Sequence, residues 1–146
     1  MTHSEIFKAI GKLERYPNYF CKSRKLRQQL AKIAKTTKPT KILKRPVWII
    51  KHSLVKDKLA IRPFGLIFIS EKIPKEFRDI VVKHEIIEEE HRFLSKRRAH
   101  TEAIKGELQY AEKRKKLEKL LNFLKRRYPR VYSERIRELT EVNRVK

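Results

Sequence analysis

Residues 64–91, FGLIFISEKIPKEFRDIVVKHEIIEEEH, decide the fold class of this chain. The stretch opens with β-branched and aromatic residues, Phe64–Ser70, which predict a short strand. Pro74 follows a turn and begins a helix at a position where proline is tolerated. The apolar residues after it recur at helical spacing as far as His91. The stretch therefore predicts a strand followed by a helix.

Two helices are predicted before this stretch. Ser4 can cap a first helix that ends near Tyr16, and Ser23 can cap a second helix that runs to Lys35. Residues 36–46 contain two prolines and four basic side chains, and they predict an extended linker.

A small antiparallel sheet of about three short strands is predicted in the middle of the chain. Val47–Ile50 and Lys58–Arg62 join Phe64–Ser70 in this sheet because all three are rich in β-branched or aromatic residues. Pro63 and Gly65 predict a bend or bulge between the last two strands.

Two long antiparallel helices and a short C-terminal helix are predicted after the sheet. The first long helix starts at Pro74, and the second runs from about Arg98 to Arg127. Pro129 ends the second, and residues 132–141 form the short helix. The predicted fold is therefore α+β and mainly helical.

The charge of the chain is concentrated in two segments. The 146 residues include 39 Lys and Arg against 17 Asp and Glu, which gives a net charge of +22. The net charge is +14 over residues 1–62, −1 over residues 63–112 and +9 over residues 113–146. This pattern predicts a polyanionic partner for the two basic segments.

Three segments are predicted as domains from these patterns. They are a basic helical N-terminal arm with its linker (1–46), an α+β core with a histidine and glutamate cluster (47–128), and a basic C-terminal helix or tail (129–146).

Composition excludes several classes of protein. One cysteine, Cys21, excludes an internal disulfide framework and a multi-cysteine metal site. Apolar runs of only four residues, such as Leu66–Ile69, exclude a transmembrane helix and a signal-peptide core. We therefore expect a cytoplasmic protein that does not bind membranes.

A histidine and glutamate cluster is the strongest chemical signal. His84, Glu88 and His91 are spaced by four and seven residues, so they share one face of a helix. The next helix carries His100 and Glu107, seven residues apart. If the two helices pack antiparallel, these metal-ligand candidates converge, and two or three of them around an open position make a Zn²⁺ site.

The same cluster allows other interpretations. Glu85 is the candidate catalytic residue, placed to activate a water molecule at the metal. The carboxylates Glu85, Glu88 and Glu89 also suit Mg²⁺ or Mn²⁺, which prefer oxygen ligands. A Glu-rich helix near basic residues is also commonly a solvated face with ion pairs, which needs no metal. The sequence leaves these alternatives open.

The strand Leu66–Ser70, the helix from Pro74 and the pair His84–Glu85 resemble the edge strand and active-site helix of zincin-type metallopeptidases. This resemblance covers residues 64–107. It implies that His84 is a metal ligand and that Glu85 is the general base.

The chain departs from the zincin signature H-E-x-x-H at one position. Glu88 stands where the second histidine belongs, so the motif is H-E-x-x-E. The resemblance then implies that His100 and Glu107 supply the missing ligands.

Two basic segments predict contact with the backbone phosphates of DNA or RNA, without readout of the bases. The predicted nucleic-acid-binding residues are Lys22, Arg24, Lys25, Arg27, Lys32, Lys35, Lys38, Lys41, Lys44 and Arg45 on one side, and Lys113, Arg114, Lys115, Lys116, Lys125, Arg126 and Arg127 on the other.

Three functions fit these observations. The first is a nucleic-acid-binding protein with a metal-dependent, nuclease-like hydrolase site. The second is a non-enzymatic DNA- or RNA-binding protein, such as a ribosome-associated, chromatin or viral component. The third is a zincin-like metallopeptidase-type hydrolase. The net charge favours the nuclease over the peptidase, because a peptidase has no evident need for it.

Overall fold

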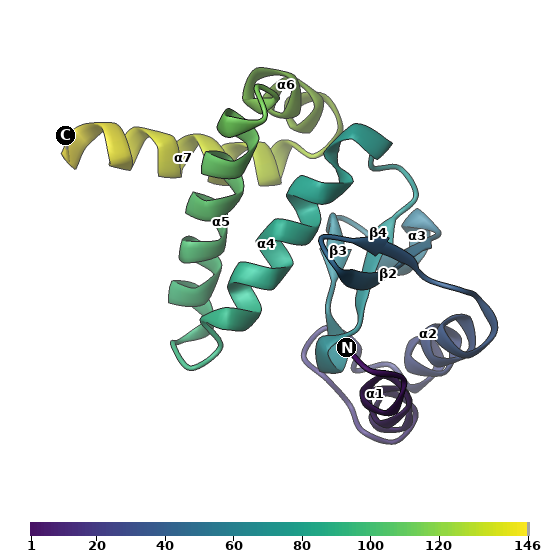
Figure 1. Ribbon diagram of the computed structural model, residues 1–146. Coiled ribbons are helices and arrows are strands. Elements are labelled where there is room, and N and C mark those ends of the chain that lie inside the picture. Colours follow the sequence, from purple (N-terminus) through teal and green to yellow (C-terminus); the bar gives the residue numbers. More distant parts are fainter. Residues whose placement is uncertain (146) are drawn as a thin grey trace. The chain divides into compact units, whose positions relative to one another are not determined.

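The computed structural model describes residues 1–145, with side chains as far as Glu141. Lys146, the last residue of the predicted C-terminal segment, lies outside the described residues. The chain divides into two compact units, residues 1–82 (unit 1) and 83–146 (unit 2). Helices predominate and a small sheet lies in unit 1, which confirms the α+β, mainly helical class (Figure 1).

Unit 1 begins with the two predicted helices. Helix α1 spans His3–Arg15 and helix α2 spans Arg24–Thr36. Ser23 caps α2 as predicted, because its hydroxyl oxygen accepts a hydrogen bond from the Leu26 N–H at 3.3 Å. The cap of α1 is Thr2 rather than Ser4.

The sheet of unit 1 differs from the prediction. It has four strands in the order β1-β2-β4-β3, with antiparallel outer pairs and a parallel central pair. The strands are β1 (Thr40–Ile42), β2 (Arg45–Ile50), β3 (Ala60–Ile61) and β4 (Ile67–Ser70). The prediction of about three antiparallel strands was therefore wrong in number and direction.

The parallel pairing of β2 with β4 has a physical cause. Residues 51–66 form a crossover that contains the short helix α3 (His52–Val55), strand β3 and a 3₁₀ turn (Pro63–Gly65). A connection of this length can carry the chain back to the starting edge, so Val47 pairs with Ile67 in a parallel register. Strand β1 lies within the segment that was predicted to be a linker.

A hydrophobic cluster joins α1 and α2 to the sheet within unit 1. Leu13 from α1 and Leu30 from α2 are fully buried in the same cluster as Trp48 and Phe68. The Trp48 and Phe68 rings stack with their centroids 5.5 Å apart. The indole N–H of Trp48 donates to the carbonyl oxygen of Thr37 at 3.1 Å, so its polar atom is satisfied.

Unit 2 is built from helices. Helix α4 spans Arg78–Glu90 and enters unit 2 at Lys83, after a 3₁₀ turn at Lys75–Phe77 in unit 1. The helices α5 (Lys96–Lys113), α6 (Leu117–Arg127) and α7 (Pro129–Val145) follow. In the described part of the chain, no helix combines the length and apolar character needed to cross a membrane.

Two predictions about these helices were wrong. The helix expected over residues 98–127 is broken into α5 and α6, because Lys115 adopts a left-handed backbone conformation with φ 58°. The N–H of Lys116 donates to the Ala111 carbonyl and that of Lys115 to the Glu112 carbonyl, which is the Schellman pattern of a helix end. The C-terminal helix has 17 residues and starts at Pro129, so it is much longer than predicted.

Within unit 2, helix α5 lies beside residues 83–90 of α4. The turn between these helices is short, and the two run antiparallel as predicted (Figure 1). A Cβ atom at Gly106 would lie 2.1 Å from Cδ1 of Ile87, so a larger residue at this position would require the Ile87 side chain to move. Ala99 and Ala103 are buried on the same face of α5. This small-residue face allows polar side chains on the two helices to meet.

We predict that unit 1 depends on the Trp48–Phe68 pair for stability. Phe68→Ala is expected to lower the free energy of unfolding by about 3–5 kcal/mol, because it leaves a cavity in a close-packed core. Urea denaturation followed by the fluorescence of Trp48 measures this loss. Phe7→Ala is the matched control, because Phe7 is 77% exposed. An equal loss in the two variants would contradict this account of the core.

Candidate metal centre

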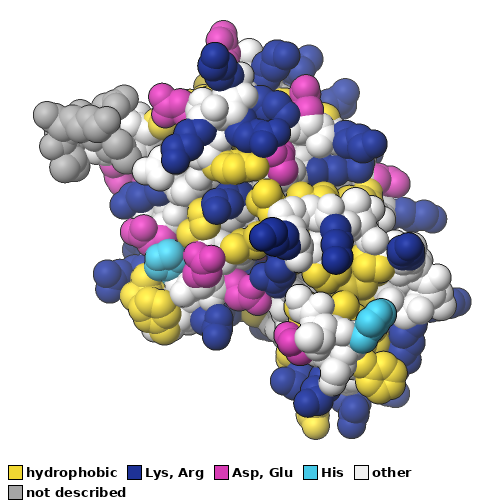
Figure 2. All heavy atoms as spheres, viewed as in Figure 1, with side chains coloured by type: hydrophobic (Ala, Val, Ile, Leu, Met, Phe, Trp, Pro, Cys, Tyr) yellow, Lys and Arg dark blue, Asp and Glu magenta, His cyan; other side chains and the backbone are white. Residues whose placement is uncertain are grey.

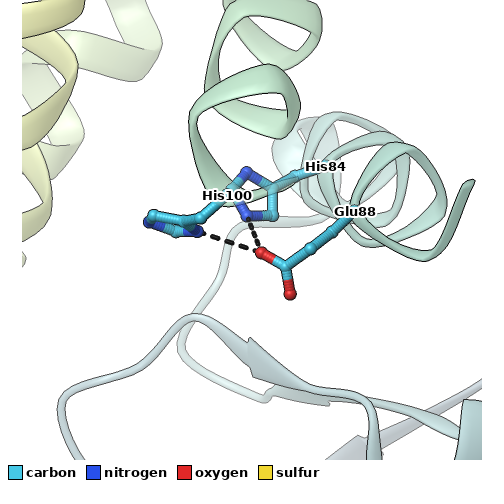
Figure 3. Close-up of side chains that lie close together, drawn as sticks. All are labelled: His84, Glu88 and His100. Atoms are coloured by element: carbon cyan, nitrogen blue, oxygen red, sulfur yellow. Dashed lines mark hydrogen bonds and ion pairs between the residues drawn. The ribbon is translucent and has the colours of Figure 1, made fainter. Parts of the chain in front are cut away.

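Three side chains in unit 2 form a group that can hold a metal ion. His84 and Glu88 lie one turn apart on α4, and His100 lies on the first part of α5 (Figure 3). Each offers one ligand atom, and these atoms lie within 4.8 Å of one another. The carboxylate of Glu88 lies between the two imidazoles, 3.4 Å from His84 Nε2 and 3.0 Å from His100 Nδ1.

The other ring nitrogen of each histidine is held by a second carboxylate. His84 Nδ1 lies 2.8 Å from Glu107 Oε1, and His100 Nε2 lies 3.0 Å from Glu134 Oε2. Histidines that bind metals in proteins commonly have a carboxylate on the nitrogen that does not face the ion, because this contact fixes the ring and its tautomer. The residues around the group therefore fit a metal site.

Arg135 connects the two outer carboxylates. Its guanidinium donates to both oxygens of Glu107, with Nη2 at 2.8 Å from Oε1 and Nε at 2.9 Å from Oε2, and Nη1 donates to Glu134. Glu107 and Arg135 are only 2% and 3% exposed. The contacts close a ring across α4, α5 and α7, which we call the charge ring: His84, Glu107, Arg135, Glu134, His100 and Glu88.

The charge ring shifts the pKa values of its members. Hydrogen bonds to Glu134 and Glu88 raise the pKa of His100 to about 9, although burial acts in the opposite direction. Burial alone would lower the pKa of His84, but its contacts with Glu107 and Glu88 raise it. Burial would raise the pKa of Glu107, yet the charge of Arg135 and the contact with His84 lower it to about 2.

The hydrogen-bond pattern of the two histidines agrees with their raised pKa values. An ionised carboxylate only accepts hydrogen bonds, so each ring nitrogen that faces one must carry a hydrogen. Both nitrogens of His84 and both of His100 face carboxylate oxygens. Without a metal ion, these contacts favour the protonated form of both imidazoles.

Three predicted site residues lie outside the ligand group. Glu107 was predicted as a metal ligand, but its two oxygens accept hydrogen bonds from Arg135, and it contacts the other ring nitrogen of His84. His91 was expected on the same face as His84 and Glu88, but its Nδ1 donates to the Ile87 carbonyl at 2.9 Å. Its ring stacks near Phe93, with the centroids 6.2 Å apart. Glu85 is buried on α4 next to His84 and is not one of the grouped ligands.

Two members of the charge ring, Glu134 and Arg135, were missed by sequence reasoning. Neither residue belongs to a motif, and Glu134 on α7 is 34 residues beyond His100 in the sequence. One signal was available. Arg135 interrupts an apolar stripe that includes Tyr132, Ile136 and Leu139, and a charged residue in such a stripe needs a partner.

Most of the predicted phosphate-binding residues lie at the surface. Those exposed in unit 1 are Lys22, Arg24, Lys25, Lys32, Lys35, Lys38, Lys41 and Lys44, and those exposed in unit 2 are Lys113, Arg114, Lys115, Lys125, Arg126 and Arg127. Arg45 and Lys116 are partly buried. Arg27 is only 7% exposed, so the structure does not present it at the surface.

Comparison of the chain with protein-family models, curated proteins and solved structures finds no match. The chemistry of the site is therefore inferred from its residues.

We predict that Arg135 stabilises unit 2 by compensating Glu107. Arg135→Gln is expected to lower the free energy of unfolding by about 3–5 kcal/mol, because it removes one partner of a buried ion pair. The double variant Glu107→Gln/Arg135→Gln should lose less free energy of unfolding than Arg135→Gln alone, because the buried charge of Glu107 is removed together with its partner. Urea denaturation measures both, with the exposed Arg137→Gln as control. A double variant as unstable as the sum of the single variants would contradict this role.

We also predict a characteristic pH dependence of stability in the metal-free protein. The pKa of His100 is raised from 6.5 to about 9, so its contribution is complete below pH 6.5 and is lost as the pH rises through 9. The pKa of Glu107 is lowered from 4.5 to about 2, so its contribution is present above pH 4.5 and is lost as the pH falls through 2. Together these two groups favour stability between pH 4.5 and 6.5.

Urea denaturation in the presence of a chelator, at several pH values from 5 to 9.5, tests this dependence. The comparison with His100→Gln removes the effect of the other charges in the chain. The wild-type protein should lose more stability than the variant above pH 6.5. Parallel curves for the two proteins would rule out a charged His100 in the folded state.

Proposed function

We propose that this chain is a zinc-dependent hydrolase that acts on nucleic acid. The observation that carries the proposal is the group His84, Glu88 and His100, in which each imidazole has a carboxylate on its other ring nitrogen. Three protein ligands leave one position of a tetrahedral ion open, as in catalytic zinc sites. An ion held there would act as a Lewis acid on a phosphoryl oxygen.

The donor set favours zinc over magnesium. Two imidazole nitrogens and one carboxylate oxygen suit Zn²⁺, whereas Mg²⁺ prefers oxygen ligands. Glu107 and Glu134 are engaged with Arg135 and the two histidines, so they support the group from outside. The sequence alone left both metals open, and the geometry supports the zinc alternative.

Charge balance also supports a divalent ion. The three carboxylates of the charge ring carry three negative charges, and Arg135 compensates one of them. The remaining two can be balanced by one proton on each histidine or by one divalent cation. A cation that replaces these protons leaves the net charge of the ring unchanged, so binding requires no uncompensated buried charge.

Glu85 is the proposed general base. It follows His84 directly, as in the H-E-x-x-E motif that resembles the zincin signature, and it is 8% exposed. Burial of a carboxylate on the helix that carries two ligands is consistent with a role in proton transfer at the same site. Because Glu88 replaces the second histidine of the zincin signature H-E-x-x-H, peptide hydrolysis is the weaker alternative.

The surface charge supports a polyanionic substrate. Lys and Arg side chains are spread widely over the face shown in Figure 2, and the chain carries a net charge of +22. Exposed cations attract phosphate backbones and release counterions on contact, which gives binding a steep dependence on salt. This charge would serve a nuclease and has no evident use in a peptidase.

A second function, a nucleic-acid-binding protein without enzymatic activity, is favoured by one observation. All four ring nitrogens of His84 and His100 already face carboxylate oxygens. The charge ring can therefore stabilise α4, α5 and α7 without an ion, and in that case its role is structural.

Metal content and nuclease activity distinguish the two functions. Protein purified without a histidine tag should retain about one zinc ion per chain. His100→Gln and Glu88→Gln should each lose most of it, whereas His91→Gln is the matched control and should retain it. Elemental analysis measures the metal, and circular dichroism confirms that each variant is folded.

The activity test uses single- and double-stranded oligonucleotides. Glu85→Gln should keep the zinc but cleave about 10²- to 10⁴-fold more slowly, because only the general base is lost. Wild-type protein that binds oligonucleotides but contains no zinc and cleaves no substrate would contradict the hydrolase and support the binding protein.

A further inference from the structure

The turn between α4 and α5 presents an aromatic side chain to solvent. Phe93 is 79% exposed, more than any other large hydrophobic side chain among the described residues. The imidazole of His91 lies near its ring, with the centroids 6.2 Å apart and an angle of 23° between the two planes. An exposed phenyl ring held beside a second ring offers a flat face for stacking.

Four basic residues surround Phe93 in sequence. Arg92 precedes it, and Lys96, Arg97 and Arg98 follow it, and all four are exposed. Arg92 Nη1 donates to the Glu89 carbonyl at 3.1 Å, which holds its side chain against the end of α4.

The three cations after Phe93 occupy a position that costs helix stability. Lys96, Arg97 and Arg98 form the first turn of α5, which contains no acidic residue. The N-terminus of a helix carries a partial positive charge, so cations are unfavourable there and anions are favoured. The first turn of α5 therefore gains stability if a phosphate contacts it.

The turn is also close to the candidate metal ligands. Glu88 lies two residues before the end of α4, and His100 is the fifth residue of α5. With a rise of 1.5 Å per residue, both lie within about 6 Å of the turn along their helix axes. A strand held at the turn therefore has a neighbouring phosphate near the ligand group.

We propose that Phe93 stacks on an unpaired base of single-stranded nucleic acid, while Arg92, Lys96, Arg97 and Arg98 contact the adjacent phosphates. This inference rests on the proposed function and specifies its substrate: a single strand, because a paired base has no free face for the ring. Phe93 is a positioning residue in this account, since it holds the strand beside His84, Glu88 and His100. The four cations favour this polyanionic occupant over an uncharged one.

Fluorescence anisotropy with a labelled single strand tests the inference. Phe93→Ala should weaken binding about 5- to 150-fold, the effect typical of the loss of one base stack. Phe93→Tyr should restore most of the affinity, because it retains the ring. Phe7→Ala is the matched control, since Phe7 is similarly exposed at 77% but lies on α1 in unit 1. Binding to a blunt duplex of the same sequence should be unaffected by Phe93→Ala.

A spectroscopic readout separates stacking from a structural effect. The variant Phe93→Trp places a second tryptophan beside the native Trp48, which is buried. If the new ring stacks on a base, added single strand should quench the emission of the tryptophan at position 93. The quenching should saturate at the concentration found by anisotropy. A blue shift with phosphatidylserine vesicles, without quenching by the oligonucleotide, would overturn the proposal in favour of a membrane contact.

The outcomes distinguish this inference from the proposed function. If the wild-type protein binds the single strand and Phe93→Ala binds equally well, the role of Phe93 is overturned and the hydrolase proposal stands. If Phe93→Ala loses affinity but the wild-type protein contains no zinc, the stacking role is supported and the hydrolase fails. If the wild-type protein binds no oligonucleotide at all, both are overturned.

Discussion

Three carboxylates meet within unit 2, and the groups that compensate their charge link the helices α4, α5 and α7. Glu107 is almost fully buried on α5, so it requires a cation at close range, and Arg135 on α7 supplies one through two hydrogen bonds. The histidines on α4 and α5 complete the compensation through Glu88 and Glu134. Gly106 on α5 has no side chain and lies next to Ile87 on α4, and polar side chains of the same two helices meet in the charge ring.

The charge ring has two ways to reach neutrality, and they correspond to the two functions considered. With a proton on each histidine, it is a buried ionic network that joins three helices. With a divalent ion in place of those protons, the same atoms form a centre with an open coordination position. The carboxylates on the outer ring nitrogens serve both states, because they orient the imidazoles whichever species lies between them. Unit 1 contributes a separate property, a hydrophobic core beneath a surface with many exposed cations.

Local patterns in the sequence predicted local structure well. Apolar spacing predicted α1 and α2, and the cap at Ser23 was predicted correctly. The four- and seven-residue spacings predicted that His84, Glu88, His100 and Glu107 would meet. The same spacing also placed His91 with them, but its Nδ1 donates to the Ile87 carbonyl instead. Features that depend on distant parts of the chain were missed. Parallel pairing of β2 with β4 depends on a crossover, the break at Lys115 has no glycine to mark it, and Glu134 and Arg135 join the ring only through tertiary packing.

In the proposed metal site, His84, Glu88 and His100 bind one divalent ion. Crystals of the protein grown with zinc, with diffraction data collected on both sides of the zinc absorption edge, would reveal this ion. We expect an anomalous peak about 2.0–2.2 Å from His84 Nε2, His100 Nδ1 and a Glu88 oxygen, with His84 Nδ1 still in contact with Glu107. A charge ring with the same hydrogen bonds and no anomalous peak between the three side chains would contradict the claim.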